Sequence, residues 1–446
     1  MRISPVVAVA LVVATLLAPV PARAQKPGAV FPFPYEAVTL DNGLTAYLIK
    51  AGSPGQIAYL SIVRTGSRDE VEAGKSGFAH FFEHMMFRGT KKYPDYDGET
   101  TKMGAFRNGT TSDDRTLYYL VANTGYLEKI IDIESDRFQN LQYSEADFKT
   151  EAGAILGEKQ QSAREPQRVL DEKVRETAFL RHPYGHTTIG YEADVRAMPQ
   201  GYVYSQAFYR RFYRPENVVV VIAGDFDSAA TTALLRKYYG GWARGYQPPA
   251  IPAEPPQATA RRKTVTYPGR TLPVLSIHHR APAWNPTDRM GVALELLGQV
   301  AFGDNSPLYR RLVLQERRVQ ALNQSFDLAR DPSLVSIQTT VSRPDDVKAV
   351  EDAILAEIRA YQDAPIDAAR LAATKQNLKY SFLMQLETAQ SVAFAVVQPL
   401  VNTGRLDAIE DYFRTLDAVT PDDIREAARR FLVESGRTTV TMVQEG

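Results

Sequence analysis

The chain has 446 residues, with 52 lysines and arginines balanced by 52 aspartates and glutamates, and it contains no cysteine. This balance gives no global field that would favour nucleic acid or a membrane surface as a partner. The absence of cysteine excludes disulfides and thiolate metal sites, so any metal site must use histidine and carboxylate side chains. The length is sufficient for two or three domains with large cores.

The first residues have the composition of a secretory signal peptide. Met1-Arg2 precede an apolar run over residues 6–20, and Ala22-Arg23-Ala24 follows as an A-x-A cleavage site. A membrane anchor is the alternative, but the run is short and rich in alanine. We predict a signal peptide at residues 1–24, no membrane span elsewhere, and an exported, periplasmic protein.

The following part of the chain, residues 25–245, alternates strand and helix patterns. Residues 38–49 have the pattern of a β-hairpin with Asn42-Gly43 at its turn. Apolar and aromatic runs predict strands, and amphipathic spacing predicts helices. The further predicted strands are residues 57–64, 115–121 and 217–224, and the predicted helices are residues 127–140 and 202–212.

Within this part, His80, Glu83 and His84 form an H-x-x-E-H sequence. Because each helical residue turns the side chain by about 100°, the two histidines share one face and Glu83 projects beside them. Two imidazoles so placed can bind one zinc ion, with the carboxylate near the open position of the ion. Ser76 is expected to cap this helix and Gly89 to end it. The alternative is a helix with two incidental histidines.

A later helix carries two glutamates on one face. The sequence Ser144-Glu145-Ala146-Asp147 is a capping box, which predicts the start of the helix. Glu151 and Glu158 follow seven residues apart, which is about two turns. Both could instead be surface charges on a solvated helix.

A proline-rich stretch divides the chain. Residues 246–262 contain five prolines and predict an extended linker. We predict a zinc-binding domain at residues 25–245 and a similar domain without metal at residues 263–446.

Internal echoes indicate that the second domain repeats the first. Residues 429–431 have the sequence Arg-Arg-Phe before a predicted strand at residues 438–443, as residues 210–212 do before the earlier strand. An apolar helix at residues 290–300 takes the place of the H-x-x-E-H helix but has no ligand residues. We therefore predict a duplication, with two unrelated α/β domains as the alternative.

The motifs resemble those of the pitrilysin, insulysin and mitochondrial-processing-peptidase family of inverted-motif zinc peptidases. The similarity is specific in the first half, architectural in the second, and the length is that of the two-domain subunits. The residues that carry it are Gly66-Ser67-Arg68-x-Glu70, the stretch from Gly77 to Thr90, Thr111-Ser112-x-Asp114-x-Thr116-x-Tyr118, and His182-Pro183-Tyr184-Gly185 with Ile189-Gly190.

The resemblance implies an α+β fold of two similar domains, each a mainly antiparallel sheet with helices packed on one face, together forming half of a clamshell. It also implies one zinc ion per chain, held by His80, His84 and Glu158, with Glu151 behind them. The ion would lower the pKa of a water molecule. Glu83 would take the proton of that water and deliver it to the leaving amine.

The resemblance also implies that a strand edge binds the substrate backbone. Asn108, Gly109 and Thr110 match that segment, although the family pattern of Asn-Ala-aromatic-Thr is not kept. In the family, an arginine and a tyrosine seven residues apart cover the substrate. Here no tyrosine follows Tyr309 before Tyr361. We therefore expect a related partner subunit to supply the pair, with a homodimer as the alternative.

The resulting expectation is a zinc endopeptidase that hydrolyses unfolded peptides in an enclosed chamber. The alternatives are a non-catalytic binding or assembly subunit of the same family and a zinc hydrolase acting on a non-peptide bond. The remaining histidines are expected to be structural. His182 and His186 flank a proline-glycine loop, and His278 and His279 are neighbours that point to opposite faces of a strand.

Overall fold

The computed structural model describes residues 29–445. The predicted signal peptide at residues 1–24 lies outside the described residues. Among the helices of the described part, none is long and apolar enough to cross a membrane.

The first sheet has six strands in the order β1-β2-β6-β3-β5-β4. All neighbours are antiparallel except β2 and β6. Strand β4 pairs only with β5, so one edge of β4 is free within this sheet. The strands are β1 (Tyr35–Thr39), β2 (Thr45–Lys50), β3 (Gln56–Val63), β4 (Phe106–Thr111), β5 (Thr116–Asn123) and β6 (Val218–Gly224).

Helices of the first half cover one face of this sheet. Alternate residues of the strands, such as Tyr59 and Val220, point to that face and form one core with the helices. The helices of this half are α1 (Phe78–Met85), α2 (Tyr96–Lys102), α3 (Leu127–Asn140), α4 (Glu145–Ser162), α5 (Pro166–Ala178), α6 (Glu192–Ala197), α7 (Tyr202–Phe212) and α8 (Ser228–Tyr239).

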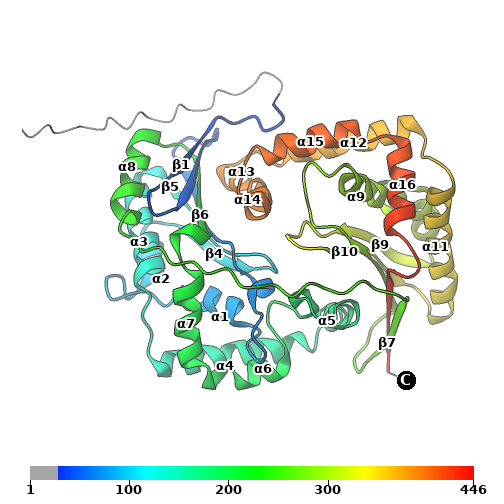
Figure 1. The fold of residues 1–446 in the computed structure, drawn as a ribbon, viewed down its shortest axis with the longest axis horizontal. Helices are drawn as coiled ribbons and strands as arrows, with labels where there is room; N and C mark the ends of the chain where they lie inside the picture. The colour runs from blue at the N-terminus through cyan, green and yellow to red at the C-terminus, as the bar shows by residue number, and fades with distance from the viewer. Residues whose placement is uncertain (1–28, 446) are drawn as a thin grey trace, which may run out of the picture.

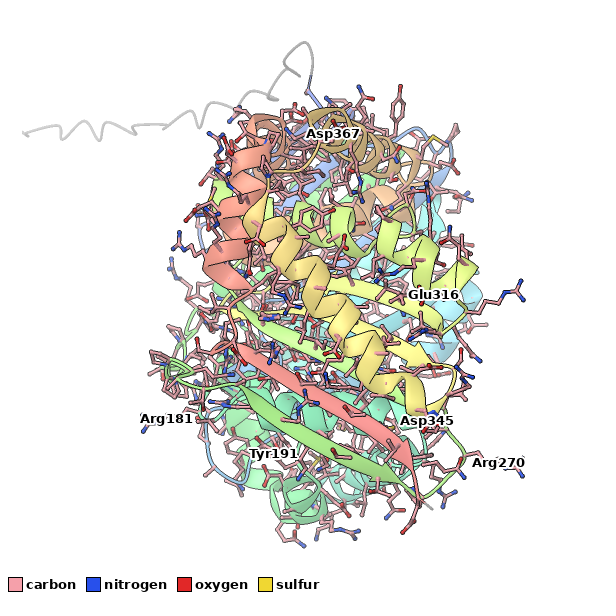
Figure 2. All side chains as sticks on the ribbon, turned by 90° about the vertical axis from the view of Figure 1, so that its right-hand side faces the viewer. Arg181, Tyr191, Arg270, Glu316, Asp345 and Asp367 are labelled. Atoms are coloured by element: carbon pink, nitrogen blue, oxygen red, sulfur yellow. The ribbon has the colours of Figure 1, made fainter. Side chains whose placement is uncertain are left out.

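The second sheet repeats this topology without a counterpart of β1. Its order is β7-β11-β8-β10-β9, and β7 and β11 form its single parallel pair. Figure 2 views this half, with β7 beside β11 and with α11 and α16 in front of the sheet. The strands are β7 (Arg261–Tyr267), β8 (Val274–Ala281), β9 (Val319–Phe326), β10 (Ser333–Val341) and β11 (Arg437–Gln444).

The helices of the second half follow the same order along the chain. Helix α9 lies between β8 and β9, as α1 lies between β3 and β4, and α16 precedes β11 as α7 precedes β6. The helices are α9 (Arg289–Phe302), α10 (Pro307–Tyr309), α11 (Val347–Asp363), α12 (Ala368–Met384), α13 (Ala389–Ala395), α14 (Val397–Thr403), α15 (Ala408–Ala418) and α16 (Pro421–Phe431).

The two halves exchange helices across their junction. Helix α5 of the first half packs on β7 and β11, and α13 of the second half packs on β3 and β6 (Figure 1). Val219 and Val221 of β6 therefore belong to one core with second-half residues such as Val392, whereas Val220 belongs to the core of the first-half helices. Each sheet is thus covered by its own helices on one face and by a helix from the other half on the opposite face.

The α+β fold with two similar, mainly antiparallel domains is confirmed. In the described chain, residues 242–260 contain no helix or strand and connect the two halves. The domain limits at residues 245 and 263 stay a prediction.

Candidate metal centre

A carboxylate from outside the helix holds the start of α1. Gly77 precedes the helix with a φ of 95°, and its backbone nitrogen donates to Glu70 at 2.7 Å. The nitrogen of Ala79 donates to the other oxygen of Glu70 at 2.6 Å. An acceptor at a helix N-terminus is favourable because the first N–H groups have no partner within the helix. Burial raises the pKa of Glu70 well above its usual value, and the hydrogen bonds from these two N–H groups oppose that rise.

The predicted cap of this helix is wrong. Ser76 does not cap α1; its backbone nitrogen and hydroxyl donate to Asp194 at 3.1 and 2.6 Å. The buried Glu70 takes over the role because it reaches the helix from η1, the turn that ends just before it. Glu70 belongs to the motif Gly66-Ser67-Arg68-x-Glu70, but nothing in the local sequence indicates that it caps α1.

Aromatic packing fixes the orientation of α1. Phe81 and Phe82 are fully buried, and the ring of Phe82 stacks on that of Phe208 with centroids 5.2 Å apart. The ring of Phe81 lies 4.9 Å from that of Phe148 on α4. These contacts hold the apolar sides of α1 in the core and leave its polar face toward α4 and β4.

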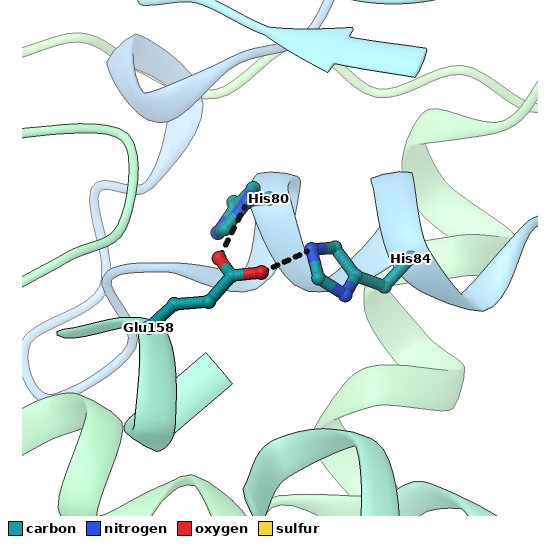
Figure 3. Close-up of side chains that lie close together, drawn as sticks. All are labelled: His80, His84 and Glu158. Carbon is teal, nitrogen blue, oxygen red and sulfur yellow. Dashed lines mark ion pairs between the residues drawn. The ribbon is translucent and has the colours of Figure 1, made fainter. Parts of the chain in front are cut away.

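On that polar face, His80 and His84 meet Glu158 of α4 (Figure 3). Each histidine Nε2 lies 3.5 Å from one oxygen of the Glu158 carboxylate. Among residues 29–445, this is the group whose ligand atoms lie within 4.8 Å of one another. A tetrahedral zinc site with ligand distances of about 2.1 Å separates its ligand atoms by about 3.4 Å. The three side chains therefore fit one zinc ion.

A second carboxylate orients His84. Glu151 accepts from Nδ1 of His84 at 2.9 Å, and its other oxygen accepts from the guanidinium of Arg88. A proton held on Nδ1 leaves the lone pair of Nε2 free to bind a metal. The hydrogen bond to His84 lowers the pKa of Glu151, so this carboxylate stays ionised.

The protonation of the two histidines also suits a cation site. Burial, together with the nearby His84, lowers the pKa of His80 to about 4, so its imidazole is neutral at pH 7. Burial opposes protonation of His84 as well, but Glu151 and Glu158 outweigh it and raise the pKa of His84. The carboxylates thus stabilise a positive charge beside His84, whether a proton or a metal ion carries it.

Glu83 lies beside the face of β4 that is turned toward α1. Its carboxylate accepts from the hydroxyl of Thr111 at 2.6 Å. Burial raises the pKa of Glu83, and the hydrogen bonds from Thr111 oppose that rise. Thr111 was identified as a motif residue in the sequence, but nothing in the pattern indicated this contact.

The predicted substrate segment adjoins this carboxylate. Asn108, Gly109 and Thr110 lie on β4, and a Cβ at Gly109 would stand 3.0 Å from Cγ of Glu83. A cavity of about 500 Å³ beside them is lined by Glu83, His84 and Asn108, among others. A second cavity of about 500 Å³ begins at His80 and Glu158 and extends along α5.

The other histidines lie outside this group. His182 Nε2 is 3.0 Å from Asp331 of the second half, and His186 bonds the carbonyl of Thr187. His278 lies between the hydroxyls of Ser276 and Ser336, at 2.7 Å from each. His279 is buried in the second sheet.

Two models of one peptidase family match the sequence. The model described as "Insulinase (Peptidase family M16)" matches residues 49–192, and "Peptidase M16 inactive domain" matches residues 205–378. The chain belongs to peptidase family M16. The resemblance drawn from the motifs is thereby confirmed. All residues of the candidate centre fall within the first match, and α9 falls within the second.

Relatives of this M16 protein include two named peptidases. Zinc protease PqqE of Helicobacter pylori is 26% identical over 415 residues, which cover 91% of this chain and 92% of that protein. The β subunit of the mitochondrial processing peptidase of Blastocladiella emersonii is 25% identical over 420 residues, with 92% and 88% covered.

Solved structures share the fold of this M16 chain. A protease from Helicobacter pylori superimposes with a TM-score of 0.84 at 26% identity, covering 92% of this chain and 99% of that one. A peptidase M16 inactive domain from Pseudomonas fluorescens gives 0.79 at 14% identity, covering 92% and 98%. The second likeness concerns the fold alone.

Proposed function

We propose that this M16 protein is a zinc-dependent endopeptidase that cleaves unfolded peptides in a chamber shared with a related subunit. The observation that carries the proposal is the convergence of His80, His84 and Glu158 within one ion's reach, with Glu83 alongside. The spacing of the three ligand atoms supports the metal-binding part of the proposal, and the position of Glu83 on the same helix supports its part in proton transfer. The names of the relatives as zinc proteases support the same reaction.

The side chains divide the work of peptide hydrolysis. His80, His84 and Glu158 would hold zinc, which when bound supplies Lewis acidity toward water and the peptide carbonyl. Glu83 takes a proton from the attacking water, whose oxygen bonds to the carbonyl carbon. As the C–N bond breaks, Glu83 passes that proton to the leaving nitrogen.

The free edge of β4 supports binding of an extended peptide. Strand β4 has no second neighbour in its sheet, so its outward N–H and C=O groups can pair with a substrate backbone. Asn108, Gly109 and Thr110 would form this contact. A peptide added there passes beside Glu83, because Gly109 adjoins that carboxylate.

A partner subunit would complete the enzyme. The arginine–tyrosine pair expected of the family is absent from the segment after Tyr309. One relative is named as a subunit of a processing peptidase. In the periplasmic protease PqqL from Escherichia coli, the matching fold makes up 47% of the chain, at 20% identity and a TM-score of 0.77. We propose that this chain is half of a clamshell that a related chain closes.

Export to the periplasm is part of the proposal. It rests on the charged start, apolar run and A-x-A sequence of residues 1–24. Cell fractionation with N-terminal sequencing of the product tests it. Cleavage after Ala24 is expected, and an uncleaved chain in the cytoplasm would contradict export.

Hydrolysis of a mixture of quenched peptides tests the reaction. The native protein and Glu83→Gln are compared, alone and with a related chain, with zinc content measured in each sample. We expect Glu83→Gln to keep zinc and to lose about two orders of magnitude or more in rate. Glu145→Gln, an exposed change on α4, serves as the control.

Two results would contradict the proposal in different ways. Loss of zinc from Glu83→Gln would assign that residue a structural role. A native protein that binds zinc but cleaves no peptide, with or without the related chain, would favour the alternative of a non-catalytic subunit.

A further inference from the structure

Strand β4 presents different side chains to its two faces. Arg107, Gly109 and Thr111 face α1 and α2, since Arg107 bonds Asp97 of α2 at 3.0 Å and Thr111 bonds Glu83 of α1. Phe106 points to the other face, where its ring lies 6.0 Å from that of Tyr119. This alternation follows from the period of two of a strand.

The face of β4 that is turned toward α1 packs closely against the Glu83 side chain. A Cβ at Gly109 would lie 3.0 Å from Cγ of Glu83 and 3.1 Å from the ring of Phe87. The carboxylate therefore passes closely over the backbone of β4 and ends at the hydroxyl of Thr111, 2.6 Å away. A hydroxyl that donates to a carboxylate is among the stronger hydrogen bonds of proteins. It restrains a side chain that otherwise rotates about three bonds.

We propose that Thr111 is a positioning residue, which ties the orientation of Glu83 to the strand that receives the substrate. The inference rests on the proposed function. A peptide paired with β4 has its carbonyl placed by the backbone of residues 108–111. The hydroxyl of Thr111, on the same segment, fixes the carboxylate that handles the protons. Residues 108–111 of β4 thus set the distance between the scissile peptide bond and Glu83, the general base.

The energetic reason is the steep dependence of proton transfer on geometry. A displacement of about 1 Å in a catalytic arrangement can cost about 100-fold in rate. Thr111→Val keeps the backbone N–H of Thr111, which also bonds Glu83, but removes the hydroxyl. Glu83 would then keep its place on α1 and lose one of the two bonds that fix the orientation of its carboxylate. The rate of the chemical step should then fall, while peptide binding and zinc binding stay the same.

Four variants separate this role from a structural one. Thr111→Val removes the hydroxyl and keeps the side-chain shape, whereas Thr111→Ser keeps the hydroxyl. Thr45→Val is the matched control, because Thr45 lies on β2, near the opposite edge of the sheet, and its hydroxyl bonds the exposed Thr39 hydroxyl at 3.3 Å. Thr111→Val combined with Glu83→Gln tests whether Thr111 acts through Glu83.

The expected result is a split between kcat and KM. For Thr111→Val we expect kcat to fall about 10- to 100-fold. KM and zinc content should stay within about twofold of the native values, and the melting temperature within a few degrees. The kcat of Thr111→Ser should stay within about threefold of the native value. The kcat of Thr45→Val should equal the native value. In the Glu83→Gln background, Thr111→Val should cause no further loss, because coupled residues are not additive.

A crystal structure of zinc-free Thr111→Val supplies a readout that needs no activity. We expect α1 and β4 to superimpose on the native protein, with the Glu83 carboxylate rotated from its native orientation while it stays near the Thr111 backbone N–H. An unchanged Glu83, a native kcat, or loss of zinc or folding in both Thr111→Val and Thr111→Ser would overturn the inference. An inactive native protein would refute the proposed function instead, and the position of Glu83 would still decide the role of Thr111.

Discussion

Helices α1 and α9 occupy the same place in two sheets of the same topology, yet they have opposite surroundings. Helix α1 keeps an open polar face with His80, Glu83 and His84, toward α4 and β4. Helix α9 is packed by α12, α15 and α16, and most of its residues are buried. The topology of the sheet sets the position of the helix. The neighbouring elements determine whether a charged group on that helix faces a cavity or the packed core.

The acids on the two helices show this difference most clearly. Glu83 faces a cavity and a hydroxyl that donates to it. Glu295 of α9 accepts from Tyr412 of α15 at 2.9 Å, and its other oxygen has no partner among residues 29–445. Burial raises the pKa of Glu295 to about 7. Glu83 thus lies beside a cavity, whereas Glu295 lies among packed helices with one oxygen bonded to Tyr412.

The largest effect is expected where a ligand of the open helix is removed. Glu158→Gln should weaken zinc binding at least 1,000-fold, because a neutral amide replaces one of three protein ligands. Glu145→Gln, on the same helix but exposed, should leave zinc binding unchanged. Competition with a chelating dye measures both affinities. Equal zinc affinity of the two variants would remove Glu158 from the site.

Glu295 on α9 should make the stability of the protein depend on pH. Glu295 has an ordinary pKa of 4.5, raised by burial to about 7 in the folded protein. Between these values the unfolded chain releases a proton that the folded protein keeps, so stability falls as pH rises from 4.5 to 7. The loss from this group amounts to at most about 3 kcal/mol, and no more is lost above pH 7.

Glu295→Gln isolates this contribution. The amide resembles the protonated acid, so native and variant should be similarly stable near pH 4.5. At pH 8 the variant should be the more stable of the two. Urea unfolding at both values measures the difference. The same gap at both pH values would show that Glu295 does not titrate between them.

The smallest expected effect compares the starts of the two helices. Helix α1 begins at the buried carboxylate of Glu70, whereas α9 begins at Asp288, a local and partly exposed cap. Glu70→Gln should cost about 2 kcal/mol of stability, because an amide NH2 replaces one of the two oxygens and leaves a buried N–H without its acceptor. Asp288→Asn should cost less than about 0.5 kcal/mol, since asparagine caps equally well. Equal losses in urea unfolding would contradict the distinction.

Local pattern predicted most of the elements. The hairpin around Asn42-Gly43 and the capping box at Ser144 occur where expected, because their signals lie within a few residues. Residues 202–212 form a helix with the predicted bounds. The apolar run at residues 217–224 forms strand β6, as predicted, and the structure shows all of its residues buried.

What the sequence could not predict depends on contacts between distant residues. Nothing local indicates that α5 covers the second sheet or that α13 covers the first, since the contacting residues lie far apart in the chain. Ser76 has the residue type and position of a helix cap, so the sequence predicts it as the cap of α1. In the structure Ser76 bonds Asp194 instead, and Glu70 accepts from the first N–H groups of the helix. The bond from Thr111 to Glu83 joins two motifs that only the folded sheet brings together.

The central claim is that this chain holds one cation between His80, His84 and Glu158. Anomalous diffraction at the zinc absorption edge, on crystals of the native protein grown with equimolar zinc, tests it most directly. We predict one peak, bound to Nε2 of both histidines and to the Glu158 carboxylate at about 2.0–2.2 Å. A peak elsewhere, or none at these three side chains, would contradict the account.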